Sequence, residues 1–180
     1  MPAPRMRTHE YFRTPETRIP QELVYGFVRE AAAPSARHQR TVGALFIRLT
    51  QHLQETGAGE AWLSPLDVVL DVEQDLVVQP DLSIVLTERA DIVVDRIWGA
   101  PDLVVEVLSP RPRIGSLEER LEWFGRYGVR ECWLVSLEGS QIEVIAFRGG
   151  ATVSTLVRRH EAVRSSVLPE LYLMPADVLL

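Results

Sequence analysis

Residues 79–108 read QPDLSIVLTERADIVVDRIWGAPDLVVEVL, and this stretch contains the two apolar runs that decide the fold. The first run, residues 82–86, directly follows Asp81, and the second, residues 103–108, carries Glu106 in its middle. Short runs that are rich in Val and Ile and bounded by Pro and Gly are typical of buried strands. We therefore predict two core strands in this stretch.

The carboxylate of Glu106 requires a partner. Side chains alternate between the two faces of a strand, so Val104, Glu106 and Leu108 share one face. An ionised carboxylate is costly in such a place unless a cation meets it. One candidate is a hard metal ion shared with Asp81, because Mg²⁺ prefers oxygen ligands. The other candidate is an ion pair with Arg120, and the sequence leaves both open.

Composition limits the possible classes of protein. The chain has 180 residues, of which 46% are hydrophobic and 24% charged, as expected for one globular domain. Its net charge of −6 argues against a surface that is basic throughout. All 19 basic residues are Arg, which excludes any mechanism that needs a lysine of this chain. Arg stabilises anions but cannot serve as a general base.

The cysteine count and the hydropathy pattern exclude further classes. Cys132 is the single cysteine, so no intrachain disulfide and no cysteine-based zinc site can form. The first residues lack a hydrophobic signal core, and no apolar stretch approaches the roughly 20 residues that span a bilayer. We therefore expect a cytoplasmic protein without a membrane segment.

Turn and cap signals predict the remaining elements. Residues 1–20 form an irregular segment with a short helical turn, and residues 21–180 form one domain that opens with a small hairpin turning at Tyr25-Gly26. Ser35 caps a helix that ends at Gly57, with an apolar face at helical spacing. Ser116 caps a second helix that ends at Gly128. Further strands are predicted at residues 62–63, 68–72, 76–78, 132–135, 142–147 and 151–158.

The order of these elements predicts an α/β architecture. A helix, several antiparallel strands, a second helix and more strands would form a central mixed sheet with helices on both faces. The second helix has an apolar stripe of Leu117, Leu121 and Phe124. Arg120 lies on the flank of that stripe, so we expect it to point towards the sheet. The polar connection of residues 88–99 is expected to hold a helical turn.

Seven stretches, in order, resemble one protein family. They read ELVYGFV, PSARHQR, SPLDVVL, VVQPDLSIV, PDLVVEVLSP, RYGVRECWLV and VLPELYL. Together they run from about Tyr11 to Leu173, and the chain is identified as similar to the Uma2 restriction endonuclease family, a branch of the PD-(D/E)XK nuclease superfamily. The resemblance implies a restriction-endonuclease-like fold.

The same resemblance implies an activity and a set of site residues. It implies a Mg²⁺- or Mn²⁺-dependent endonuclease that acts on nucleic acid, expected to be DNA, as a homodimer. Asp81 and Glu106 would be metal ligands, and Glu22 would assist as a third. His38, in the PSARHQ motif, would position a phosphate or a water molecule, and Arg120 would stabilise negative charge on the phosphate.

The chain departs from the family pattern at one position. The family carries its lysine on the second helix in a D-x-x-x-K pattern, where this chain has Ser116 and Arg120. Leu108 stands two residues after Glu106, so no lysine is found there either. The departure leaves open a second hypothesis, a catalytically degenerate module that keeps the fold for binding.

Other interpretations of these residues also stay open. His38 could be a capping or solvated residue, and Glu22 a charge at a strand edge. Asp67 and Asp71 flank a strand and could lie in solvent or near the site. A third hypothesis, a carboxylate-pair glycosidase, would need its two carboxyl groups to straddle a cleft for a sugar.

Overall fold

A six-stranded mixed sheet forms the centre of the computed structural model, which describes residues 5–15, 17, 19–109 and 116–179. Its strand order is β11-β10-β9-β8-β6-β3. The neighbours are antiparallel except for β8 and β9, which run parallel. The strands are β3 (Gly59–Leu63), β6 (Leu82–Leu86), β8 (Leu103–Leu108), β9 (Glu131–Ser136), β10 (Gln141–Arg148) and β11 (Ala151–Val157).

The N-terminal hairpin belongs to a second, five-stranded sheet of order β2-β1-β5-β4-β7. The hairpin is confirmed, but it joins a larger sheet because Leu23 of β1 pairs with Val77 of β5. The sequence missed β7, since a strand of two residues is too short to show alternation. The strands are β1 (Gln21–Val24), β2 (Phe27–Glu30), β4 (Val68–Asp71), β5 (Leu76–Val78) and β7 (Ile97–Trp98).

Both long helices begin and end where the sequence predicts. The Ser35 hydroxyl accepts a hydrogen bond from the His38 amide, and the Ser116 hydroxyl accepts one from the Glu119 amide. Gly57 and Gly128 end the two helices in the left-handed conformation, which glycine adopts without strain. The helices are α1 (Thr8–Tyr11), α2 (Ala36–Thr56) and α3 (Leu117–Tyr127), with 3₁₀ turns η1 (Thr87–Ile92) and η2 (Pro175–Asp177).

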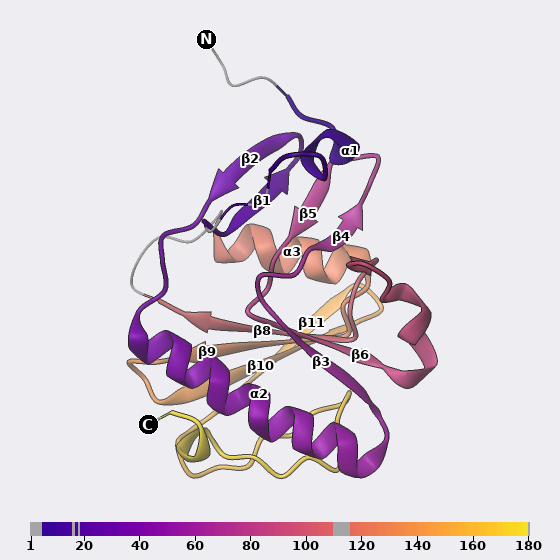
Figure 1. Cartoon of the computed structure of the whole chain (residues 1–180). Helices are drawn as coiled ribbons and strands as arrows, with labels where there is room; N and C mark the ends of the chain where they lie inside the picture. The colour runs from indigo at the N-terminus through magenta and orange to yellow at the C-terminus, as the bar shows by residue number, and fades with distance from the viewer. Residues whose placement is uncertain (1–4, 16, 18, 110–115, 180) are drawn as a thin grey trace.

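The elements are stacked in layers (Figure 1). Helix α2 and the C-terminal segment cover one face of the six-stranded sheet, and α3 lies on its other face, beneath the five-stranded sheet. The predicted α/β architecture with helices on both faces is therefore confirmed. A second buried cluster fills the space between the two sheets and includes Val24 of β1, Val104 of β8 and Trp123 of α3.

Helix α3 buries two members of the predicted stripe, Phe124 and in part Leu121, but leaves Leu117 exposed and adds Trp123. Leu117 is 37% exposed, whereas Trp123 and Phe124 are 2% and 1% exposed. Arg120 is also buried, which confirms that it faces the sheets. The buried positions 120, 123 and 124 keep helical spacing, but the first of them is charged. A pattern built from apolar residues alone leaves Arg120 out of the stripe, and only its place on the flank indicated its direction.

Candidate active site

The alternation of β8 delivers Glu106 to the space between the sheets. Val105 and Val107 point into the core beneath α2, while Val104 packs in the cluster between the sheets. Glu106 shares the face of Val104 and is 1% exposed. Residues 103–107 of this strand are all buried, so Glu106 lies among packed side chains.

Asp81 is brought beside Glu106 by the register of β6 and β8. The two strands are antiparallel and Leu82 pairs with Val105. One residue further, this register places Asp81 opposite Glu106. Side chains at opposed positions of an antiparallel pair lie on the same face. The Val107 amide donates to Asp81 Oδ2 at 2.7 Å, which anchors the carboxylate directly before β6.

His38 contacts Asp81 from the first turn of α2. Its Nε2 atom lies 3.3 Å from Asp81 Oδ2, and the residue is 5% exposed. The interpretation of His38 as a solvated residue is therefore wrong, since packing of α2 against the sheet encloses the ring. The Ser35 cap sets the position of its backbone, and the imidazole reaches the carboxylate.

Glu22 approaches the site from the five-stranded sheet. It lies on β1, is 2% exposed, and its Oε1 atom accepts from the Gln79 amide at 2.7 Å. The interpretation of Glu22 as a charge at a strand edge is therefore wrong, because β1 lies between β2 and β5. Its carboxylate faces inward because Leu23 and Val24 pack into clusters on either side of the β1 backbone.

Arg120 joins the carboxylates of the two sheets. Its Nη1 atom donates to both oxygens of Glu22, at 2.9 and 2.7 Å. Its Nε and Nη2 atoms donate to Glu106 Oε1, at 3.0 and 2.5 Å. The ion pair between Glu106 and Arg120, one of the two partners that the sequence left open, is therefore present. Burial alone would lower the pKa of Arg120, but Glu106 and Glu22 raise it above its usual value, so the guanidinium stays charged.

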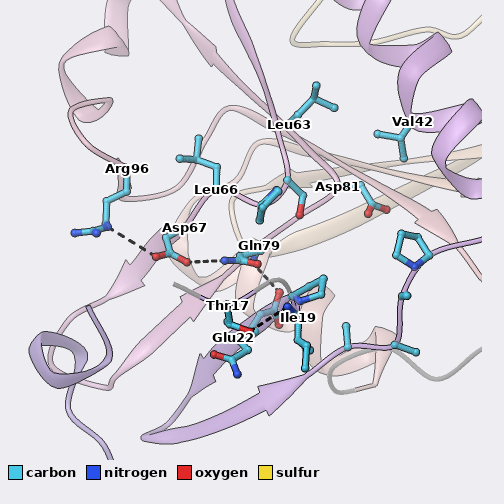
Figure 2. Close-up of a pocket in the computed structure, with 18 of the residues that line it drawn as sticks. Thr17, Ile19, Glu22, Val42, Leu63, Leu66, Asp67, Gln79, Asp81 and Arg96 are labelled. Carbon is cyan, nitrogen blue, oxygen red and sulfur yellow. Dashed lines mark hydrogen bonds and ion pairs between the residues drawn. The ribbon is translucent and has the colours of Figure 1, made fainter. Parts of the chain in front are cut away.

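These residues border a pocket of about 880 Å³ between the sheets. All five predicted site residues line it, so the structure brings them together as expected. Figure 2 shows Asp81 and Glu22 reaching the pocket from different elements. The lining also includes the apolar side chains Leu63 and Leu66.

A second polar group in the pocket was not predicted. Gln79 Nε2 donates to Asp67 Oδ1 at 2.9 Å, and Arg96 Nε lies 3.8 Å from Asp67 Oδ2. Figure 2 shows Arg96, Asp67 and Gln79 in a row that leads to Glu22. Desolvation by burial raises the pKa of Asp67 above its usual value. Of the two aspartates that the sequence left undecided, Asp67 lies in the pocket, whereas Asp71 Oδ1 accepts from the amides of the following turn.

The sequence contained one usable signal for this second group. Gln79 stands in the same QPD motif as Asp81, so its position beside the site follows from that of its neighbour. Arg96 gives no such signal, because it lies in a polar connection whose short strand β7 could not be predicted.

The carboxylates have the right chemistry for a divalent cation but not the right arrangement. Asp81, Glu106 and Glu22 offer the oxygen ligands that Mg²⁺ and Mn²⁺ prefer. However, Glu22 and Glu106 both hold the guanidinium of Arg120. Within the described ranges, no three His, Cys, Asp or Glu side chains form a group that could hold a metal ion. As arranged, these residues do not fit the ion, which would have to displace Arg120.

The α/β fold of the chain is shared with a protein of known structure. The structure resembles a crystal structure from Anabaena variabilis ATCC 29413, described as a putative nuclease belonging to DUF820, with a TM-score of 0.80. The two share 18% sequence identity, and the match covers 97% of each chain. No curated protein matches the chain.

The family is established by the match to a sequence model. The model of the Uma2 family, described as "Putative restriction endonuclease", matches residues 8–176. The chain therefore belongs to the Uma2 family, as its motifs indicated. No helix among the described residues is long and apolar enough to cross a bilayer.

Proposed function

We propose that the protein is a nuclease that hydrolyses phosphodiester bonds in DNA. The observation that carries the proposal is the convergence of Glu22, Asp81 and Glu106 on one pocket together with Arg120, in a chain of the Uma2 family. Glu22 and Glu106 come from strands of the two sheets, Asp81 from the position before β6, and Arg120 from a helix. Burying so many charges is costly if stability is their only role. Such clusters of buried charge are typical of functional sites.

The roles of the side chains follow from their contacts. Arg120 lines the pocket and would stabilise negative charge on a phosphate; a pair of parallel hydrogen bonds to that phosphate would replace bonds that it now donates to Glu22 and Glu106. His38 holds Asp81 in position through its Nε2 atom. Asp81, Glu106 and Glu22 are the proposed ligands of Mg²⁺ or Mn²⁺, and binding of the ion would require that Arg120 leave Glu22 and Glu106. A bound cation would supply an activated water molecule and neutralise charge on the phosphate.

Cleavage of DNA tests this function. Supercoiled plasmid, linear duplex and single-stranded DNA are incubated with Mg²⁺ or Mn²⁺, with EDTA as the metal-free comparison and RNA as the alternative substrate. The wild type should cleave DNA, and Glu106→Gln should lower the rate by about 100-fold, as for other losses of site electrostatics. Glu118→Gln, on the exposed side of α3, is the matched control and should cleave normally.

Two outcomes would contradict the proposal. Cleavage that survives in Glu106→Gln would show that the site is elsewhere. A wild type that neither cleaves nor binds either cation in calorimetry would leave the alternative, a degenerate binding module. That alternative is favoured by one observation, namely that the arginine in the lysine position spends its donors on Glu22 and Glu106.

Three other expectations concern the type of activity, the oligomeric state and the location of the protein. A glycosidase is disfavoured, because Asp81, directly before β6, lies beside the Glu106 region of the paired strand β8 rather than on the opposite wall of a cleft. The homodimer stays a prediction, which light scattering of the purified protein tests. The cytoplasmic location also stays a prediction.

A further inference from the structure

The charged side chains of the candidate site lie in a recess rather than on an open surface. Those of Glu22, Glu106 and Arg120 are 2–4% exposed. Those of His38 and Asp81 are 7% and 15% exposed. All five line the pocket of about 880 Å³, a size typical of sites that enclose one small organic molecule. A DNA duplex is a stiff rod with its bases stacked inside it, so it cannot enter such a pocket without local opening.

The charge of the pocket also disfavours a duplex. Among the described residues that line it, two are arginines and five are carboxylates, namely Glu22, Asp67, Asp81, Asp95 and Glu106. A duplex carries about one negative charge per 1.7 Å of its axis, which is twice the charge density of one strand. The bases of a single strand, by contrast, are uncharged and offer flat apolar faces. The part of DNA that this pocket accepts most readily is therefore an unpaired base.

Two exposed aliphatic side chains line the same pocket. Leu63, the last residue of β3, is 40% exposed, and Ile19, two residues before β1, is 47% exposed. Leu63 pairs with Leu82, which directly follows Asp81, so its backbone lies beside the candidate site. In the view of Figure 2, Asp81 lies between Leu63 and Ile19. The recessed charges are thus flanked by apolar surface that remains open to a ligand.

We propose that Leu63 and Ile19 form a base clamp, which holds one unstacked base of single-stranded DNA in the pocket. Enzymes that act on nucleotides outside a duplex hold the base between apolar or aromatic side chains. Leucine and isoleucine also separate neighbouring bases in other DNA complexes. The inference rests on the proposed nuclease function and names its substrate class, which is single-stranded or unpaired DNA rather than intact duplex.

Fluorescence anisotropy of labelled DNA tests the preference for a single strand. Labelled oligo-dT, and the duplex that it forms with oligo-dA, are each titrated with the wild type. The titrations are run in EDTA, since contact with a base needs no metal ion and the DNA then stays intact. The single strand should bind at least about tenfold more tightly than the duplex, within the range of base-stacking contributions to single-strand binding.

The double variant Leu63→Ala/Ile19→Ala removes the base clamp. Its affinity for oligo-dT should fall by about tenfold, because two aliphatic contacts with the base are lost, and its affinity for the duplex should change by less than about twofold. The matched control is Leu156→Ala/Ile47→Ala, which should bind both DNAs as the wild type does. Leu156 is 40% exposed on β11, the opposite edge strand of the same sheet, and Ile47 is 66% exposed on α2. Both lie outside the described lining of the pocket.

Three results would overturn the base clamp. These are binding of oligo-dT that is absent or no tighter than that of the duplex, unchanged affinity of the clamp variant for oligo-dT, and an equal loss of affinity for both DNAs in that variant. The base clamp and the nuclease function fail separately. Cleavage of DNA without the expected differences in binding would remove the base clamp alone. The expected differences in binding without cleavage would remove the nuclease function and leave a site that binds single strands.

Discussion

The pocket contains two clusters in which one arginine lies between two carboxylates, and they differ in burial. We call Arg120 with Glu22 and Glu106 the inner cluster, whose side chains are 2–4% exposed. The outer cluster is Arg96 with Asp67 and Asp95, whose side chains are 22%, 19% and 57% exposed. The same residue types thus occur in a buried and in a partly exposed environment within one pocket.

The contacts within the clusters differ accordingly. Arg120 makes four hydrogen bonds to its two carboxylates, at 2.5–3.0 Å. Arg96 lies 2.8 Å from Asp95 and 3.8 Å from Asp67, and its guanidinium also stacks on the Phe12 ring at 3.7 Å. The side chains of the outer cluster are partly exposed, so solvent screens their charges. In the inner cluster, each charge depends on its protein partner, so removal of a partner costs far more.

The largest effect is expected for Arg120→Met, which leaves two buried carboxylates without their guanidinium. We expect the free energy of unfolding to fall by about 3–5 kcal/mol, the usual cost of breaking a buried ion pair. Urea unfolding at neutral pH measures it. The double variant Arg120→Met/Glu106→Gln should lose less than the single variant, because one of the stranded charges is then removed. If the free energy of unfolding falls by less than about 1 kcal/mol in Arg120→Met, the inner cluster stabilises the fold no more than an exposed ion pair does.

Arg96→Met should have a much smaller effect. Its carboxylate partners keep contact with water, so we expect a change in unfolding free energy within about 1 kcal/mol. The same urea series measures it beside Arg120→Met. A loss as large as that of Arg120→Met would mean that stacking on Phe12, rather than burial of charge, determines how strongly an arginine stabilises this pocket.

The smallest effect is expected for Asp67→Asn, and it depends on pH. Because burial raises the pKa of Asp67 in the folded state, the folded protein holds this proton more tightly than the unfolded chain does. Its contribution is therefore most favourable below the usual aspartate pKa and is lost as the pH rises through the raised value. Asparagine does not titrate, so Asp67→Asn should gain in stability relative to the wild type over that rise, by about 2 °C in Tm.

Thermal unfolding from pH 4 to pH 7, read as the difference in Tm between the two proteins, measures this gain. A difference that stays constant with pH would show that Arg96 and Gln79 balance the desolvation of Asp67. Asp71→Asn serves as the comparison, because Asp71 accepts from the amides of an exposed turn outside the pocket.

Much of the fold could be predicted from local signals. Ser35 and Ser116 are hydroxyl caps and Gly57 and Gly128 are left-handed stops, and each acts within one helical turn of its own position. The two runs around Asp81 and Glu106 formed strands β6 and β8 for an equally local reason, since β-branched residues fit a buried strand. The second sheet was missed because it depends on a pairing between Leu23 and Val77, which are far apart in the chain.

The candidate site divides in the same way. Asp81, Glu106, Glu22 and His38 stand in motifs, so the sequence named them, and the register of β6 and β8 follows from two neighbouring runs. The sequence left open what neutralises Glu106, because a metal ion and Arg120 both satisfied the same physical requirement. It also gave no reason to group Arg96 with Asp67, since a two-residue strand brings them together.

The sequence by itself therefore determined most of the elements, the family and the five proposed site residues, because caps, strand runs and motifs act over short distances. Only the tertiary structure decided which charges meet. Placement of α3 between the two sheets brings Arg120 into contact with Glu22 and Glu106, which lie 98 and 14 positions away in the chain. The physical reason is that burial, which makes this pairing necessary, arises only when both sheets close over the helix.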